Sequence, residues 1–110
     1  MKRAIGIAGA GAWGQALAFV ARAAGHEVSI WSRREPDLQS LARTDAIVLA
    51  VPAQVCREVL TIIAPVLRKG QPLIVCAKGI EQETGLFMNE VAAEVAPVAR
   101  AMVLSGPSFA

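Results

Sequence analysis

The sequence predicts an α/β protein with a mostly parallel sheet of about five strands between two layers of helices. Short apolar runs alternate with amphipathic stretches along the whole chain, which is typical of strands connected by covering helices. At 110 residues the chain has room for one domain with one modest core. Hydrophobic residues make up 55% of the chain and aromatic residues only 5%. Small aliphatic side chains must therefore fill the core, as they do in strands that are buried on both faces.

The elements follow from hydrophobic periodicity and from the residues that end each run. Gly25 is expected to end the first helix as a C′ residue, and Asp37 to begin the second. Pro65 is expected to mark the last turn of the third helix. The predicted strands are residues 4–8, 27–31, 46–51, 73–77 and 101–104. The predicted helices are residues 13–24, 37–43, 53–68 and about 84–95.

The simplest strand order is 2-1-3-4-5, with a right-handed crossover between each pair of parallel strands. The second strand, Glu27-Val-Ser-Ile-Trp31, alternates in polarity as an edge strand does. Only a short connection is left to cross the first strand and begin the second half of the sheet. A short helix suffices for that crossing.

Composition excludes several classes of protein. The net charge of +2 and the scattered basic residues argue against a nucleic-acid partner. Every uninterrupted apolar run is far shorter than the roughly 20 residues that span a bilayer, so we expect no membrane span and a soluble, cytoplasmic protein. Cys56 and Cys76 show no metal-ligand spacing and lie in apolar segments, which predicts buried thiols in a reducing compartment and no metal site.

A glycine-rich turn follows the first strand and precedes the first helix. In the run Gly9-x-Gly11-x-x-Gly14 the first glycine permits a tight turn, the second admits a pyrophosphate, and the third allows close helix–strand packing. The N–H groups of the first helical turn, at Ala12 and Trp13, then face the phosphates. In this strand–turn–helix context the pattern predicts a dinucleotide site and a Rossmann-type, doubly wound, three-layer αβα domain over residues 1–110.

The end of the second strand reads Trp31-Ser32-Arg33-Arg34. A protein that requires NAD usually carries an acidic residue at this place, to hold the ribose 2′-hydroxyl. A guanidinium here can bind a 2′-phosphate or stack on adenine, whereas the alternative is a solvated loop. We predict that Arg33 and Arg34 contact the cofactor, NADPH or NADH, with NADP favoured.

Ligands of open α/β sheets bind beyond the carboxyl ends of the strands. Lys78 leaves a buried strand at this edge and can hold a substrate phosphate or an oxygen near the nicotinamide, unless it only reaches to water. The segment 105–110 offers hydroxyls and open backbone amides, although a plain turn looks the same. Glu81 and Glu83 are expected in a solvated loop.

Five segments together resemble the bacterial NAD(P)-dependent glycerol-3-phosphate dehydrogenases, in order and along nearly the whole chain. The most specific of them among Rossmann enzymes are Lys-Gly-Ile followed by Ser-Gly-Pro-Ser-Phe-Ala. The segments are Gly9-Ala-Gly-Ala-Trp-Gly14, Trp31-Ser-Arg33, Asp45-Ala-Ile-Val-Leu-Ala-Val-Pro52, Ala77-Lys-Gly-Ile80 and Ser105-Gly-Pro-Ser-Phe-Ala110.

The resemblance implies an enzyme that interconverts dihydroxyacetone phosphate and sn-glycerol 3-phosphate, a precursor of phospholipids. It implies that Gly106 and Ser108 bind this small phosphorylated substrate, and that Lys78 lies at both substrate and cofactor. The cofactor contacts that it implies are Ala12, Trp13, Arg33, Arg34, Lys78 and Ala110.

The chain departs from the family pattern in two places. About thirty residues that the family carries after Arg34 are absent, either because the domain is naturally reduced or because a stretch was removed or omitted. The family's C-terminal helical domain, with its general acid/base lysine, would follow residue 110, so we expect no catalytic residue within the chain and no activity from it alone. The alternatives are a stand-alone NAD(P)-binding redox sensor and a related NADP-dependent reductase.

Overall fold

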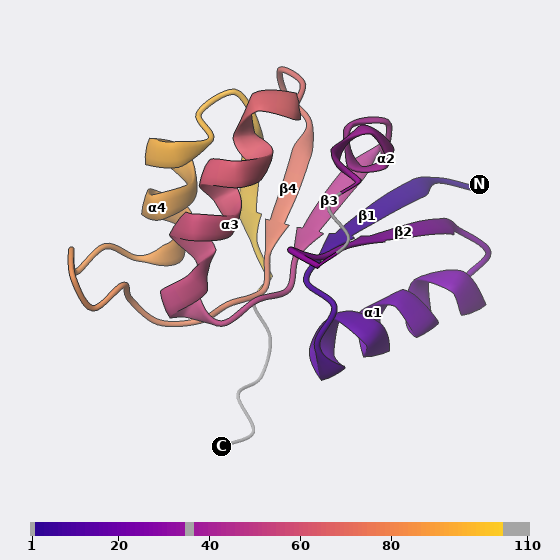
Figure 1. Cartoon of the computed structure of the whole chain (residues 1–110), viewed down its shortest axis with the longest axis horizontal. Helices are drawn as coiled ribbons and strands as arrows, with labels where there is room; N and C mark the ends of the chain where they lie inside the picture. The colour runs from indigo at the N-terminus through magenta and orange to yellow at the C-terminus, as the bar shows by residue number, and fades with distance from the viewer. Residues whose placement is uncertain (1, 35–36, 105–110) are drawn as a thin grey trace.

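The described part of the chain contains one sheet of five parallel strands, in the predicted order β2-β1-β3-β4-β5 (Figure 1). The structure is a computed structural model that describes residues 2–34 and 37–104. The strands are β1 (Ala4–Ala8), β2 (Glu27–Trp31), β3 (Ala46–Leu49), β4 (Pro72–Val75) and β5 (Arg100–Val103). The Rossmann-type three-layer αβα fold is therefore confirmed, with every strand pair parallel.

The helices are divided unequally between the two faces of the sheet. Helix α1 (Ala12–Ala23) packs on β1 and β2, and in Figure 1 it lies apart from the other helices. Helices α2 (Leu38–Ala42), α3 (Cys56–Ile63) and α4 (Met88–Val95) contribute to the core on the opposite face. Among the described helices, α1 alone covers its face of the sheet.

The core is correspondingly asymmetric. The larger cluster joins alternate residues of β3 and β4, such as Leu49 and Leu73, to buried side chains of the covering helices, such as Leu41 and Leu60. The smaller cluster, under α1, has Ile7 and Ala18 near its centre. Strand alternation assigns neighbouring residues to opposite faces. Strands β1, β2 and β3 contribute to both clusters, whereas β4 and β5 contribute to the larger one.

Local signals at two helix ends act as predicted. The N–H of Gly25 donates to the carbonyl of Arg22, and the N–H of His26 donates to the carbonyl of Ala21, which together form a Schellman motif. Gly25 has a φ of +93°, a conformation that favours glycine. At α2 the Asp37 carboxylate accepts from the backbone N–H of Ser40 at 3.1 Å.

Two predicted helices were wrong in extent. The helix expected over 53–68 is divided into a 3₁₀ turn at Ala53–Val55, the α-helix α3 and a second 3₁₀ turn at Ala64–Val66 that contains Pro65. Proline lacks the N–H that an α-helix needs and crowds the preceding turn. The helix expected from residue 84 begins at Met88, because Gly85 has a φ of +73° and closes a turn before it.

None of the helices in the described part of the chain has the length and apolar character that crossing a membrane requires.

Candidate dinucleotide site

The carboxyl ends of β1, β2 and β3 surround a cavity of about 470 Å³. This volume lies within the range of roughly 300–1,000 Å³ that is usual for small-molecule sites. None of the lining residues carries a carboxylate, and two carry a guanidinium. They are Gly9, Ala10, Gly11, Trp31, Ser32, Arg33, Arg34, Val51, Pro52, Val55 and Val59.

Each glycine of the turn meets a different steric requirement. Gly9 has a φ of +131°, and a Cβ built there would lie 2.3 Å from the carbonyl oxygen of Ala50. A Cβ at Gly14 would lie 2.0 Å from the carbonyl oxygen of Gly9, within the contact between α1 and the turn. A Cβ at Gly11 would meet no described atom within 4 Å. Gly9 and Gly14 are thus required by the fold, whereas Gly11 borders open space in which a ligand fits.

The N-terminus of α1 faces this same edge of the sheet. Gly11 is its N-cap, no side chain caps the helix, and the first turn carries no acidic residue. The first N–H groups of a helix have no partner within it, so they suit an anion such as a pyrophosphate. Ala12 and Trp13 are both exposed and line a further cavity of about 340 Å³ beside Pro52. The residues present therefore fit the phosphates of a dinucleotide.

Arg33 and Arg34 follow β2 and are both exposed at the larger cavity. Nη1 of Arg33 lies 2.8 Å from Oε1 of Glu58 on α3, so the two side chains form an ion pair. Beside them Trp31 is buried, and its Nε1 has no hydrogen-bond partner within residues 2–34 and 37–104. Sequence reasoning missed Glu58, because nothing in the local sequence relates it to an arginine 25 positions earlier.

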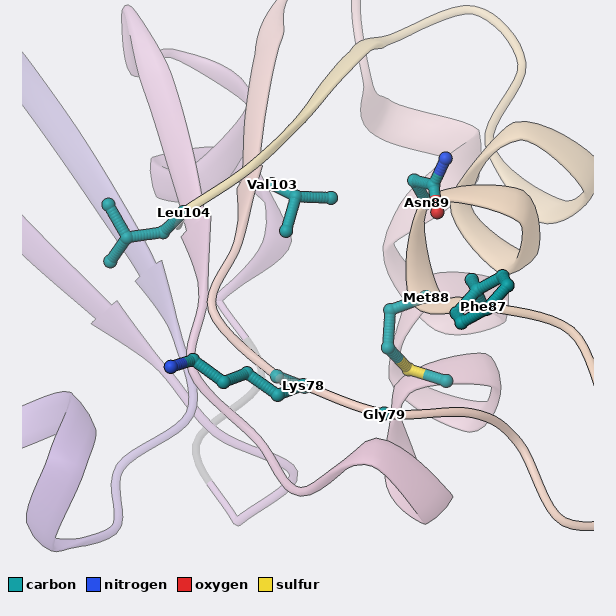
Figure 2. Close-up of a pocket in the computed structure, with 8 residues that line it drawn as sticks. Lys78, Gly79, Phe87, Met88, Asn89, Val103 and Leu104 are labelled. Atoms are coloured by element: carbon teal, nitrogen blue, oxygen red, sulfur yellow. The ribbon is translucent and has the colours of Figure 1, made fainter. Parts of the chain in front are cut away.

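Lys78 follows β4 and borders a third cavity of about 300 Å³. Figure 2 shows its side chain pointing away from Met88 and Phe87, which line the same cavity. Lys78 is exposed. The lysine and the larger cavity both lie at the carboxyl edge of the sheet, on either side of the end of β3.

The loop after Lys78 is held to α3 by a polar cluster that sequence reasoning did not foresee. Glu81 is only 7% exposed, so the expectation of a solvated loop was wrong for this residue. Arg57 donates to both of its carboxylate oxygens, at 2.9 and 3.0 Å. This guanidinium, with a hydrogen bond from Thr84, lowers the pKa of Glu81. Gln54 also donates to the carbonyl of Ile80 at 3.1 Å, which ties the loop to the start of the same helical segment.

The two cysteines are free thiols, as expected, but only one of them is buried. Burial raises the pKa of the Cys56 thiol to about 11. Cys76 follows β4 directly and is half-buried. Burial also raises the pKa of Cys76, and a hydrogen bond with Trp13 acts in the opposite direction.

The remaining predicted site residues, Gly106, Ser108 and Ala110, lie outside the described residues. Within the described ranges, no group of three or more His, Cys, Asp or Glu side chains is arranged to hold a metal ion.

Comparison with known proteins identifies relatives over almost the whole chain. The glycerol-3-phosphate dehydrogenase [NAD(P)+] of Azorhizobium caulinodans is 47% identical over 134 residues, which cover 96% of this chain and 41% of that protein. The enzyme of the same name from Parvibaculum lavamentivorans is 43% identical, over 98% of this chain and 41% of its own length. The chain thus spans about 41% of the length of these relatives.

Among solved structures, the glycerol-3-phosphate dehydrogenase of Coxiella burnetii matches with a TM-score of 0.80 at 28% identity, covering 98% of this chain and 42% of that one. The 134 aligned positions of the Azorhizobium relative exceed the 110 residues of this chain, which agrees with an internal segment that the relative has and this chain lacks.

The family described as NAD-dependent glycerol-3-phosphate dehydrogenase N-terminus matches residues 4–45 and 35–110, two ranges that overlap at 35–45, directly after Arg34, where the missing segment was expected. The chain belongs to this family of N-terminal, nucleotide-binding dehydrogenase domains.

Proposed function

We propose that the chain is the cofactor-binding part of an sn-glycerol-3-phosphate dehydrogenase that reduces dihydroxyacetone phosphate in the cytoplasm, for phospholipid synthesis. The observation that carries this proposal is the open space at Gly11, next to an uncapped helix N-terminus and a cavity lined by two arginines. When bound, NAD(P)H supplies the hydride. The enzyme names of relatives at 47% and 43% identity support the same reaction class.

The roles of individual residues follow from where they lie. The N–H groups of Ala12 and Trp13 bind the pyrophosphate, and Gly9, Gly11 and Gly14 shape the turn beneath it. Arg33 and Arg34 bind the adenosine end, with NADPH bound at least as well as NADH, since no carboxylate lines this cavity. Lys78, which follows β4 at the carboxyl edge of the sheet, holds the substrate together with Gly106 and Ser108, while Ala110 contacts the cofactor. The proton-donating lysine belongs to the part of the enzyme beyond residue 110.

Binding of the two reduced cofactors tests the proposal directly. Titration of the chain with NADPH and with NADH, followed by calorimetry or by the fluorescence of its two tryptophans, Trp13 and Trp31, should give saturable binding at up to millimolar concentration. Replacing Gly11 with Val should abolish it, because the new side chain occupies the space of the pyrophosphate. Since a Cβ at Gly11 would meet no described atom within 4 Å, and the φ of −75° at this residue suits any side chain, the variant should keep its fold.

A matched control is Ala23→Val, an exposed position at the far end of the same helix. It adds a branched side chain to α1 without approaching the turn, so its affinity should equal that of the parent chain. Absence of binding by the parent chain, or unchanged affinity in a folded Gly11→Val variant, would refute the proposed site.

A further inference from the structure

The ion pair between Arg33 and Glu58 stands at the edge of the proposed adenosine cavity. Arg33 lines this cavity, and so do Val55 and Val59, which flank Glu58 in the sequence of α3 and the turn before it. The nitrogen–oxygen distance is 2.8 Å, and the two side chains are 54% and 58% exposed. Glu58 therefore brings a negative charge to a cavity that has no carboxylate among its own lining residues.

This charge affects the two cofactors differently. A phosphate monoester carries a charge of about −1.5 to −2 at neutral pH, whereas a ribose 2′-hydroxyl carries none. A 2′-phosphate that approaches Arg33 must share the guanidinium with Glu58 and then lies near a like charge. A 2′-hydroxyl is uncharged, so it neither competes with Glu58 for the guanidinium nor is repelled by it. A carboxylate can also accept a hydrogen bond from this hydroxyl.

We propose that Glu58 is a specificity-determining residue: by holding Arg33 and adding a negative charge beside it, Glu58 reduces the preference for NADPH over NADH. The inference rests on the proposed function, because it assumes that a dinucleotide binds in this cavity. It assigns to one side chain of α3 the role that an acidic residue at the end of β2 has in NAD-dependent proteins.

The substitution that tests this role leaves the fold intact. Exposed ion pairs contribute little to stability, and the variant Glu58→Gln keeps the size of the side chain and one acceptor oxygen while it removes the charge. The matched control is Glu27→Gln, which changes the net charge by the same amount. Glu27 forms an exposed ion pair with Lys2 at 3.4 Å, at the start of β2 and so at the opposite end of the strand from the cavity.

Dissociation constants for NADPH and NADH are measured at fixed ionic strength for the parent chain and both variants. In Glu58→Gln the ratio of NADH to NADPH dissociation constants should rise about threefold to tenfold, mostly through tighter NADPH binding, which is the range between an exposed ion pair and a charge-assisted hydrogen bond. Glu27→Gln should leave the ratio unchanged. The same contrast is expected between 2′,5′-ADP and 5′-AMP, which differ by the 2′-phosphate alone and isolate the adenosine end.

A second variant establishes whether Arg33 transmits the effect. In an Arg33→Met background, the change in ratio caused by Glu58→Gln should shrink, because the guanidinium that pairs with Glu58 is gone. An unchanged ratio in folded Glu58→Gln, or equal changes in both dissociation constants, overturns the inference while leaving the proposed function standing. Failure of the parent chain to bind either dinucleotide overturns the proposed function and this inference with it.

Discussion

At the scale of single residues, backbone contacts decide which glycines of the turn the fold requires and which one has open space in front of it. Gly14 lies inside α1, where alanine would ordinarily be favoured over glycine by about 1 kcal/mol. Its position against the carbonyl oxygen of Gly9, however, leaves no room for a Cβ. Gly11 has extended backbone angles, with a φ of −75°, and open space in front of it.

Gly14→Ala should therefore destabilise the protein, although helix propensity alone predicts the opposite. Because the obstacle is backbone and cannot rotate away, we expect a net loss of about 1–3 kcal/mol in the free energy of unfolding, as for overpacked sites. The matched substitution Gly11→Ala should change stability by less than about 0.5 kcal/mol. Urea unfolding followed by circular dichroism measures both, and equal stabilities of the two variants would contradict the packing argument.

At the scale of elements, the loop between β4 and α4 is positioned by its contacts with α3 and not by its own regularity. Arg57 joins Glu81 of the loop and Glu94 of α4, with its Nη1 lying 2.9 Å from Oε1 of Glu94. Gln54 accepts from the N–H of Gln82 at 3.0 Å in addition to its bond to Ile80. Lys78 lies three residues before Glu81, so this cluster also sets the path of the chain that presents the lysine to the carboxyl edge.

Glu81→Gln should lower the melting temperature at pH 7 by about 4–8 °C. A shift of this size corresponds to a loss of about 1 kcal/mol in the free energy of unfolding of a small domain. Arg57 lowers the pKa of Glu81 in the folded protein, so the ionised carboxylate stabilises the fold above the ordinary glutamate pKa of 4.5. This stabilisation is lost as the pH falls through the lower, folded value.

The difference in melting temperature between Glu81→Gln and the parent should thus narrow as the pH falls below 4.5. Glu83→Gln is the matched control, since Glu83 is exposed in the same loop. Calorimetric scans over a pH series provide the measurement. A difference that persists undiminished at low pH would mean that packing, and not the charge of Glu81, holds the loop.

At the scale of the whole molecule, the uneven placement of helices means that side chains on the two faces of the sheet are buried to different extents and contribute unequally to stability. Leu73 is 1% exposed and belongs to the larger cluster, under α3 and α4. Its neighbour Ile74 points to the other face, is paired in register with Val48 and Met102, and is only half-buried. Met102 is 39% exposed, so the sheet face beyond α1 is apolar but open.

Alanine substitutions at these two neighbouring positions should lower the free energy of unfolding by different amounts. Leu73→Ala should cost about 2–5 kcal/mol, the usual range for truncation in a closed core. Ile74→Ala should cost about 1–2 kcal/mol, since less of its apolar surface leaves water on folding. The midpoints of denaturant unfolding measure the two losses, provided that the free energy of unfolding depends on denaturant concentration with the same slope in both variants. A loss at Ile74 as large as that at Leu73 would show that its face is closed in solution.

The sequence by itself determined the order and type of the main elements, the strand order and the place of the glycine-rich turn between β1 and α1. These rest on local physics: apolar runs, turn glycines and the reach of short connections. Single residues such as Gly25 and Asp37 could be assigned for the same reason, because each acts on backbone groups within a few positions of itself.

Only the tertiary structure decided which distant side chains meet. Glu58 pairs with Arg33, and Glu81 is buried against Arg57, across separations of 25 and 24 residues. Ion pairs of this kind leave no periodic trace in a sequence, since a charged residue looks the same whether it faces water or a partner. The late start of α4 was equally hidden, because the left-handed turn at Gly85 competes with a helical pattern that begins before it. Which helix covers which part of the sheet is likewise a property of the assembled chain.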